Sequence, residues 1–394
     1  MFSHRLRVAS LLFQVTCLAL MFGQTAGAQQ ESNPVPAQAS AATDQQKPPD
    51  SSPAPAPSVW SVGPIDFSGL IDGYYSFNAN HPASQNNQLR NFDLKANQFS
   101  LNMAKLSLEH LPDPVGFRVD LGFGRAFDLI HSGEQAPEIF RYLEQVYVSL
   151  KPKEAKGFEA DFGEFVTSAG AEVIETKDNW NYSRSILFSY AIPYYHFGLR
   201  TSMPIGKSFT AGFQLVNGWN NIEDNNSGKT IGVTGAFTRP KFTWSNNYYT
   251  GPENTGTNSG FRNLYDTTLL LTPSDKLNAY INFDYGHARR VLSGIDRWIG
   301  VAGAVRVAPT KWFAITPRAE YYYDATGFTT GTRQKLNEVT VTGEFKMAEG
   351  LLTRLEYRRD HSDVPFFDRG QTAAASQNQT TLLVGVVAFF GPKR

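Results

Sequence analysis

Apolar and polar residues alternate with a period of two from Ile65 to the end of the chain. The stretch KLNAYINFDYG shows the pattern clearly. Its apolar phase consists of Leu277, Ala279, Ile281, Phe283 and Tyr285, and the positions between them include Asn278, Asn282 and Asp284. Because successive side chains of a strand point to opposite faces, this alternation predicts β-strands with one apolar and one polar face.

The chain contains about sixteen such runs. They lie near 65–78, 95–109, 115–126, 143–151, 157–166, 194–203, 208–219, 229–238, 240–250, 261–272, 274–286, 295–307, 311–323, 335–347, 351–360 and 378–390. In the second run the apolar phase shifts around Ala104–Lys105, which predicts a β-bulge there.

The connections between these runs alternate between short and long. The short ones read HLPDPVG, KPKEAKG, PIGK, TRPK, TPSDK, APTK and MAEG, with the Pro, Gly and charged residues that tight turns require. The long ones fall near 79–94, 127–142, 167–193, 220–228, 251–260, 287–294, 324–334 and 361–377. This predicts an all-β protein, a transmembrane antiparallel β-barrel of about 16 strands with short periplasmic turns and long external loops. A soluble sandwich or propeller is the alternative, but such a fold does not require all its short connections at one end of the strands and all its long ones at the other.

Aromatic residues gather near both ends of the predicted strands. After the short turns the apolar phase carries Phe117, Phe158, Phe209, Phe242 and Phe313; toward the long loops it carries Phe77, Phe123, Trp219, Tyr248, Tyr285 and Tyr323. Aromatic side chains form girdles at both interfaces of a membrane, whereas a soluble core would scatter them through the strand middles. The two rims therefore favour a membrane barrel.

The final run, TTLLVGVVAFFGPKR, is too short for a membrane helix, which needs about 20 apolar residues, but it suits a tilted membrane strand. Its outward stripe consists of Leu382, Val384, Val386, Ala388 and Phe390. The other phase, with Leu383, Val387 and Phe389, is also apolar, which departs from the rule that the inside of such a barrel is polar.

The first 28 residues have the three parts of a secretory signal peptide. Arg5 and Arg7 precede an apolar run, and Ala26-Gly27-Ala28 offers a cleavage site; an uncleaved anchor is the alternative. Residues 29–58 are rich in Pro, Ala, Ser and Gln and bury too little apolar surface to fold, so we expect a disordered tether. Residues 59–394 would form the barrel.

Composition argues against several other classes of function. The chain has 36 basic and 36 acidic residues, and the signal peptide takes away two arginines, so no basic excess favours nucleic acid. The seven histidines are scattered and no HExxH motif occurs, so we expect no metal, no cofactor and no enzyme. A barrel phospholipase would need a histidine at lipid level, whereas His196 lies on an inward phase. GFGRAF at 122–127 precedes no expected helix, so its glycines should relieve crowding inside the barrel.

A sixteen-stranded barrel is wide enough to leave an aqueous channel. On the inward phases we expect pore-lining charges at Arg118, Asp120, Arg200, Arg318, Glu320, Arg354 and Glu356, and further charges at Glu159, Asp161, Asp284, Arg306, Glu338, Glu344 and Arg358. Rings of charge set ion preference, and the mixed signs predict weak selectivity. Pairing between neighbouring strands is the alternative role for each of them.

The third long connection, residues 167–193, far exceeds an ordinary hairpin loop, and loops of that length are usually functional or disordered. Its apolar and aromatic residues need a surface to pack on. It could fold over the outside as a lid or subunit contact, or fold inward and narrow the channel; we favour the inward path. The candidate constriction residues are then Glu172, Glu175, Lys177, Asp178 and Arg184, facing the inward arginines.

Three stretches carry a family resemblance: GLIDGYYSFN (69–78), LPDPVGFRVDLGFG (111–124) and AGAEVIETKDNWNYSRSILFSYAIPYYHFGLR (169–200). They resemble the OmpL-like, porin-2 family of β-barrel porins, and the similarity runs from near residue 60 to the C-terminus. The resemblance implies an outer-membrane barrel that passes small hydrophilic solutes. It carries over no binding residues.

We therefore expect a porin for passive diffusion of small hydrophilic solutes and ions across a bacterial outer membrane. One alternative is a channel specific for a sugar or an anion, in which Trp180 and Tyr182 would supply a sugar track. Another is a blocked barrel whose external loops bind a partner or surface. The expected partners are outer-membrane lipid and small solutes, with no nucleic acid, and the resemblance allows a homotrimer.

Overall fold

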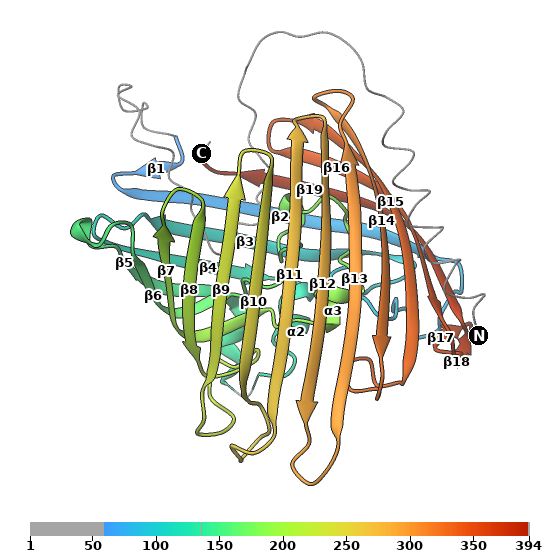
Figure 1. Ribbon diagram of the computed structural model, residues 1–394. Helices are drawn as coiled ribbons and strands as arrows, with labels where there is room; N and C mark the ends of the chain where they lie inside the picture. Colours follow the sequence, from blue (N-terminus) through green and yellow to red (C-terminus); the bar gives the residue numbers. More distant parts are fainter. Residues whose placement is uncertain (1–58, 135, 393–394) are drawn as a thin grey trace. The chain divides into compact units, whose positions relative to one another are not determined.

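The computed structural model describes residues 59–134 and 136–392. The predicted signal peptide (1–28) and tether (29–58) lie outside the described residues. In the described part, one antiparallel sheet of sixteen strands closes on itself (Figure 1). The strands are β2 (Ile65–Asn78), β3 (Gln98–His110), β4 (Val115–Phe123), β5 (Leu143–Leu150), β6 (Glu159–Val166), β7 (Tyr195–Ile205), β8 (Phe209–Val216), β9 (Thr230–Arg239), β10 (Phe242–Pro252), β11 (Phe261–Ser274), β12 (Leu277–Arg289), β13 (Ile295–Val307), β14 (Phe313–Asp324), β15 (Gln334–Ala348), β16 (Leu351–Ser362) and β19 (Asn378–Phe390).

Each strand pairs with its neighbour in sequence, and the barrel closes where β19 pairs with β2, with Leu382 opposite Phe77. All sixteen predicted strands are confirmed, and their ends agree within three residues. The predicted bulge is also present, slightly earlier than expected. Asp72 pairs with Met103 and Gly73 with Leu101, which leaves Asn102 as the extra residue.

The strands expose apolar side chains outward and bury polar ones inward. Along β15, for example, Val339 and Val341 are exposed, whereas Glu338, Thr340 and Thr342 are buried. A continuous exposed apolar surface of this kind is typical of a protein that faces lipid. Aromatic residues mark both rims on the outside, with Phe117 and Phe209 at the short-turn end, and Phe123, Tyr248 and Tyr285 at the long-loop end.

Trp219 was wrongly assigned to this outer girdle. The strand β8 ends at Val216, three residues earlier, and the Trp219 ring packs edge-on against the buried Trp298, with the centroids 6.2 Å apart. Trp219 therefore belongs to the packing of the long loops.

The long loops contain further short elements. They are α2 (Arg125–Ile130), η1 (Glu138–Tyr142), η3 (Thr176–Asp178), α3 (Ile186–Tyr190), and the hairpin of β17 (Phe367–Arg369) and β18 (Thr372–Ser376). The two-residue β1 (Ser61–Val62) pairs with the start of β2, and η2 (Lys153–Ala155) lies in a short turn. Among the described residues, no helix is long and apolar enough to cross a membrane.

The helix α2 corrects one expectation, because it begins at Arg125, inside GFGRAF. The role expected of the glycines is nevertheless present at Gly122. A Cβ atom there would lie 1.7 Å from the ring of Phe127, so only glycine leaves room for this α2 side chain inside the barrel.

Candidate functional site

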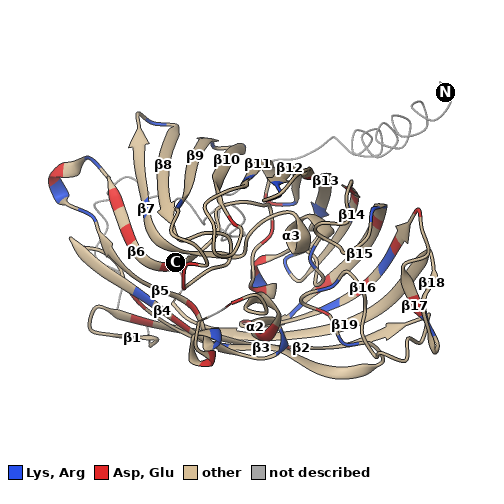
Figure 2. Cartoon of the chain, turned by 90° about the horizontal axis from the view of Figure 1, so that it is seen from below, with Lys and Arg blue, Asp and Glu red and all other residues tan. Residues whose placement is uncertain are grey.

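The third long loop, residues 167–193, folds into the barrel. Most of its residues are buried and none is exposed, and its helix α3 lies within the ring of strands, next to β13 and β14 (Figure 2). The inward path is therefore the one that the structure adopts.

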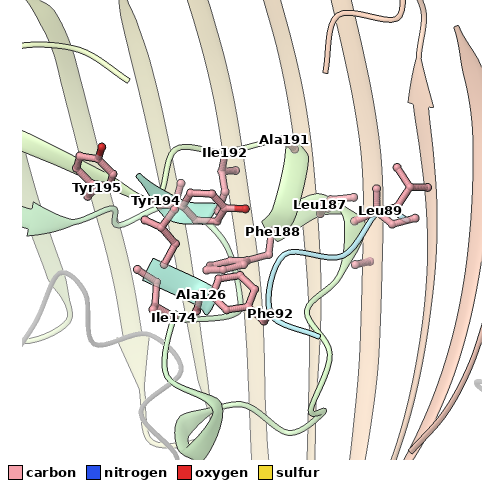
Figure 3. Close-up of a cluster of buried hydrophobic side chains, with 14 of the residues drawn as sticks. Leu89, Phe92, Ala126, Ile174, Leu187, Phe188, Ala191, Ile192, Tyr194 and Tyr195 are labelled. Atoms are coloured by element: carbon pink, nitrogen blue, oxygen red, sulfur yellow. The ribbon is translucent and has the colours of Figure 1, made fainter. Parts of the chain in front are cut away.

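An apolar cluster holds the inner loops together (Figure 3). Leu187, Phe188 and Ile192 of the third loop pack with Leu89 and Phe92 of the first long loop. The α2 side chains Phe127 and Ile130 belong to the same cluster. Three long loops thus form one core inside the barrel, which gives the third loop a fixed position.

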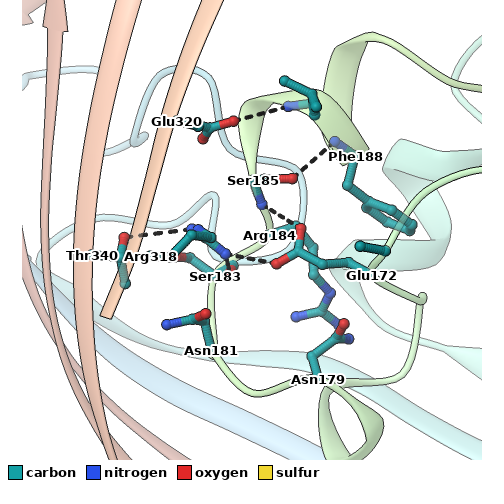
Figure 4. A network of polar contacts seen from close by, with 12 residues as sticks. Glu172, Asn179, Asn181, Ser183, Arg184, Ser185, Phe188, Arg318, Glu320 and Thr340 are labelled. Atoms are coloured by element: carbon teal, nitrogen blue, oxygen red, sulfur yellow. Dashed lines mark hydrogen bonds and ion pairs between the residues drawn. The ribbon is translucent and has the colours of Figure 1, made fainter. Parts of the chain in front are cut away.

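Two carboxylates on the barrel wall bind consecutive backbone amides of the third loop. Glu356 on β16 accepts hydrogen bonds from the N–H groups of Tyr182 (2.7 Å) and Ser183 (3.0 Å). Glu320 on β14 does the same for Ile186 (2.7 Å) and Leu187 (3.2 Å) at the start of α3 (Figure 4). Carboxylate bonds to backbone N–H groups are among the stronger hydrogen bonds in proteins, so these pairs fix the loop to the wall.

Arginines from the same wall supply the opposite charge. Arg318 on β14 binds Glu172 of the loop at 2.7 Å and Glu338 on β15 at 3.3 Å, and it donates to the carbonyl oxygen of Ser183 at 2.7 Å (Figure 4). The side chains of Arg318 and Glu172 are 0% and 3% exposed. A buried pair of this kind requires all its hydrogen bonds, because an unmatched buried charge is costly.

Two further arginines bind backbone carbonyls of the loop. Arg354 on β16 pairs with Glu344 at 2.7 Å and donates to the carbonyl oxygen of Thr176 at 2.5 Å. Arg184, in the loop itself, donates to the carbonyl oxygens of Val173 (2.9 Å) and Tyr182 (2.5 Å). These bonds stiffen the loop where it has no regular secondary structure.

The apolar inward phase of the last strand is explained by Tyr182. This ring is fully buried and packs with Leu383 and Val387 of β19, while its hydroxyl donates to Asp72 at 2.6 Å. A Cβ atom on Gly385 would lie only 2.2 Å from the Tyr182 ring. The inner face of β19 is therefore apolar because it packs against the loop instead of facing water.

On the other side of the loop, Lys105 of β3 joins three carboxylates. Its ammonium group lies 3.0 Å from Asp120 and 2.6 Å from Glu144, and it also binds Glu175 of the loop. These carboxylates are close enough to hold a metal ion, but the lysine already supplies the positive charge. Burial alone would raise the pKa of Glu175, but the attraction of Lys105 and Lys177 outweighs it and lowers this pKa to about 2.

A polar cavity of about 260 Å³ lies between the loop residues 166–178 and the strands β3–β11. Its charged lining consists of Glu109, Arg118, Glu159, Asp161, Glu172, Glu175, Asp178 and Arg200. Arg200 pairs with Asp161 at 2.8 Å and lies over the ring of Phe165, and Arg118 pairs with Asp120 at 3.0 Å. The Arg118 side chain is 28% exposed, so this wall, unlike that of β14–β16, is open to solvent.

Ten of the twelve candidate residues thus fall into two groups of five. Five that we expected to line the pore or its constriction are instead buried between wall and loop: Arg184, Arg318, Glu320, Arg354 and Glu356. Those that line the cavity are Arg118, Arg200, Glu172, Glu175 and Asp178, with Glu172 mostly covered. Asp120 lies beneath Arg118, and Lys177 pairs with Asp178 at 2.5 Å.

Sequence reasoning missed several functional side chains, including Lys105, Asp72 and the anchoring role of Tyr182. The apolar inner phase of β19 was the signal for Tyr182, since an apolar lumen face needs an apolar partner. Trp180 and Tyr182 are only 3% and 0% exposed, so they form no exposed sugar track. Trp180 packs on Tyr280, with the centroids 5.3 Å apart.

The comparisons with known proteins agree with this geometry. The model of the family described as beta-barrel porin-2, OmpL-like, matches residues 64–390. The chain belongs to this family. This porin has no match among curated proteins.

Among solved structures, the porin resembles several outer-membrane channels. OmpT of Vibrio cholerae in its trimer form is 11% identical, with a TM-score of 0.57, and the match covers 83% of this chain and 99% of that one. The anion-selective porin from Comamonas acidovorans is 11% identical, with a TM-score of 0.56 and coverage of 83% and 99%. The channel DcaP of Acinetobacter baumannii is 10% identical, with a TM-score of 0.54 and coverage of 84% and 99%. At such low identity these likenesses show the shared barrel fold alone.

Proposed function

We propose that this porin is a passive diffusion channel for small hydrophilic solutes and ions, which pass through the polar cavity between the third loop and the strands β3–β11. The observation that carries the proposal is the position of the loop. It is bound to the wall of β14–β16, while a polar space remains beside Arg118 and Arg200. A pore narrowed in this way selects by width and by the charges along its wall.

The charges along this path are mixed, which favours weak ion selectivity. Arg118 and Arg200 face the carboxylates of Glu175 and Asp178 on the loop, and further carboxylates come from Glu109, Glu159 and Asp161. Many of these groups already have a partner of opposite charge. A small hydrated ion of either sign would therefore find compensating groups along the path.

In this proposal the signal peptide, residues 1–28, is removed, the long loops face the outside of the cell, and the short turns face the periplasm. The chain needs no cofactor for diffusion and catalyses no reaction. A homotrimer is the assembly we expect, and the similar OmpT barrel, which has a trimer form, supports it.

Single-channel recording in a planar bilayer tests the proposal. Deletion of residues 170–190 should raise the conductance of the folded protein severalfold, because the loop fills part of the lumen. A deletion of residues 290–293 in the exposed β12–β13 loop is the control and should leave conductance unchanged.

Two results would contradict the proposal. The absence of any current from correctly folded wild-type protein would favour a blocked barrel whose external loops bind a partner. Equal conductance of the folded 170–190 deletion and the wild type would show that the loop does not narrow the path. Block of the current by a sugar or an anion would identify a solute-specific channel.

A further inference from the structure

Four basic side chains lie on the outer surface of the barrel at its long-loop end. They are Arg289, Arg297, Lys335 and Arg359, and all four are exposed. Each occupies the outward phase of its strand. On β15, Lys335 and Val339 are exposed while Leu336 between them is fully buried. We call these four residues the basic row.

The basic row extends over the neighbouring strands β12 to β16, of which β14 contributes no basic residue. Arg297 pairs with His287 across β12 and β13, Lys335 with Tyr323 across β14 and β15, and Arg359 with Val339 across β15 and β16. Since neighbouring strands lie about 4.8 Å apart, the row from β12 to β16 is roughly 19 Å wide.

The row lies just beyond the outer aromatic girdle. On the same outward face, one or two outward positions deeper, Tyr285 of β12, Tyr321 of β14 and Tyr357 of β16 are exposed. Tyrosines at this place mark the level of lipid head groups, and long basic side chains next to them extend their charge toward the interface. The four charges are thus held at the height of the outer head groups.

One exposed acidic side chain, Asp363, lies beside the row, where it accepts a hydrogen bond from the backbone N–H of Lys335 at 2.7 Å. Within residues 59–134 and 136–392, none of the four makes an ion pair; Arg359 donates to Asn378 at 3.0 Å, and the Lys335 ammonium lies 5.6 Å from the centre of the Tyr323 ring. The neighbouring acids Asp296, Asp324 and Asp360 are buried on the inward phase. Among the described residues, the three arginines of the row therefore present positive charge that no acidic side chain pairs with.

The parts of the rim on either side of the row have a different character. At the corresponding ends of β2, β3, β10 and β11, the outward side chains are Phe77, Phe99, Tyr248 and Phe261, all exposed. Facing lipid as such therefore requires no basic residues at this height, and the row is a local feature of β12–β16.

We propose that the basic row binds the phosphate groups of a phosphorylated glycolipid in the outer leaflet. The guanidinium groups of Arg289, Arg297 and Arg359 can each bind a phosphate through two parallel hydrogen bonds, and Lys335 adds a point charge. The acyl chains of the same lipid would cover the apolar face below, including Tyr285 and Tyr321. This proposal rests on the orientation proposed above, with the long loops outside.

Lipid binding to the purified full-length protein in detergent tests the proposal, with diphosphorylated lipid A as the probe. Native mass spectrometry should show bound lipid A on the wild type. The variant with Arg289→Gln, Arg297→Gln, Lys335→Gln and Arg359→Gln should bind lipid A more weakly by a factor of at least roughly ten. The control removes four exposed charges from the short turns, Lys207→Gln, Lys241→Gln, Lys276→Gln and Lys311→Gln, and should bind as the wild type does.

Four results would overturn the proposal: equal binding by the two quadruple variants, equal binding of dephosphorylated lipid A, displacement of lipid A by millimolar inorganic phosphate, or a change of oligomeric state in the row variant. The third would identify a site for free phosphate and the fourth a contact with a second copy of the chain. Conductance is recorded for both variants. Wild-type currents together with unchanged lipid binding would reject the lipid site and leave the proposed channel intact.

Discussion

The wall of β14–β16 and the wall of β4–β7 carry the same kinds of charged residue on the same inward phase, yet they differ in what lies against them. On β14–β16 the third loop covers Arg318 and Arg358, whose side chains are both 0% exposed. On β4–β7 the cavity leaves Arg118 and Arg200 partly exposed. A charged side chain inside this barrel thus either anchors the third loop or lines the cavity, depending on where the loop lies. Its position on the inward face of a strand does not by itself decide between these two roles.

The first prediction compares one arginine from each wall. Arg318→Met leaves Glu172 buried without its cation and Glu338 with Arg358 alone, at 3.5 Å, which should destabilise the folded barrel by about 3–5 kcal/mol. Arg200→Met removes the ion pair with Asp161 on the solvent-exposed wall and should lower the stability of the folded barrel clearly less. The temperature at which the folded barrel unfolds, followed by circular dichroism, measures both. Equal losses of thermal stability would show that the two walls are energetically alike.

The second prediction concerns the packing of the loop on β19. Gly385→Ala would place a Cβ atom 2.2 Å from the Tyr182 ring, and such overpacking typically costs about 1–3 kcal/mol. The loop should shift, and the current should fluctuate more than in the wild type. The matched control is Gly303→Ala, where the nearest heavy atom outside the adjoining residues is 3.4 Å away; it should behave as the wild type does. A quiet current and an unchanged stability in Gly385→Ala would contradict the placement of Tyr182.

The third prediction concerns the open wall. Replacing Arg118 and Arg200 by glutamine removes two positive charges beside the cavity and should favour cations. A charge about 8 Å from an ion in water contributes ~0.5 kcal/mol. Removing two such charges favours a cation and disfavours an anion by about 1 kcal/mol each, so the ratio of cation to anion permeability should rise roughly 30-fold at low salt. The reversal potential in a salt gradient measures it. Lys207→Gln, in an exposed short turn, should leave the ratio unchanged, and a similar shift in this control would remove the special role of the cavity.

The smallest effect is expected for pH. Because the pKa of Glu175 is lowered in the folded protein, to about 2 from the ordinary 4.5, its ion pair with Lys105 persists at every pH above 4.5 and is lost only as the pH falls through 2. The difference in conductance between the wild type and Glu175→Gln should therefore stay constant between about pH 5 and pH 8. In a Lys105→Met background the pKa of Glu175 should be higher, because burial raises it and Lys105 no longer lowers it. On acidification, the difference in conductance should then disappear at a higher pH than in the protein with Lys105. A step near pH 4.5 in the otherwise unchanged protein would contradict the pairing with Lys105.

The strands could be predicted because each one must satisfy lipid on one face and polar groups on the other. This requirement produces the alternation of apolar and polar residues in stretches such as 277–285, whatever lies on the other side of the lumen. The aromatic rims follow from the same cause, since the membrane interfaces lie at fixed heights on every strand. Trp219 was misplaced because a loop residue next to a strand can continue its apolar phase without continuing its backbone.

The site could be predicted only in part. Length and apolar content indicated that the third loop needs a surface, and the seven charged strand residues that we assigned to inward phases lie inside the barrel. The sequence could not show that Arg318, Glu320 and Glu356 meet the loop while Arg118 and Arg200 do not. Such contacts join residues more than a hundred positions apart, and no local pattern encodes them.

The sequence by itself determined a barrel of β2–β16 and β19 and its two chemically opposite faces, because these depend on the solvent that each strand meets. The tertiary structure alone decided how the lumen is divided, since this depends on where Tyr182 and the neighbouring amides of the loop find apolar contacts and carboxylate acceptors on the wall. The apolar inner face of β19 illustrates the difference. The sequence showed that this face is apolar, but only the tertiary structure shows the reason, which is that it packs against Tyr182.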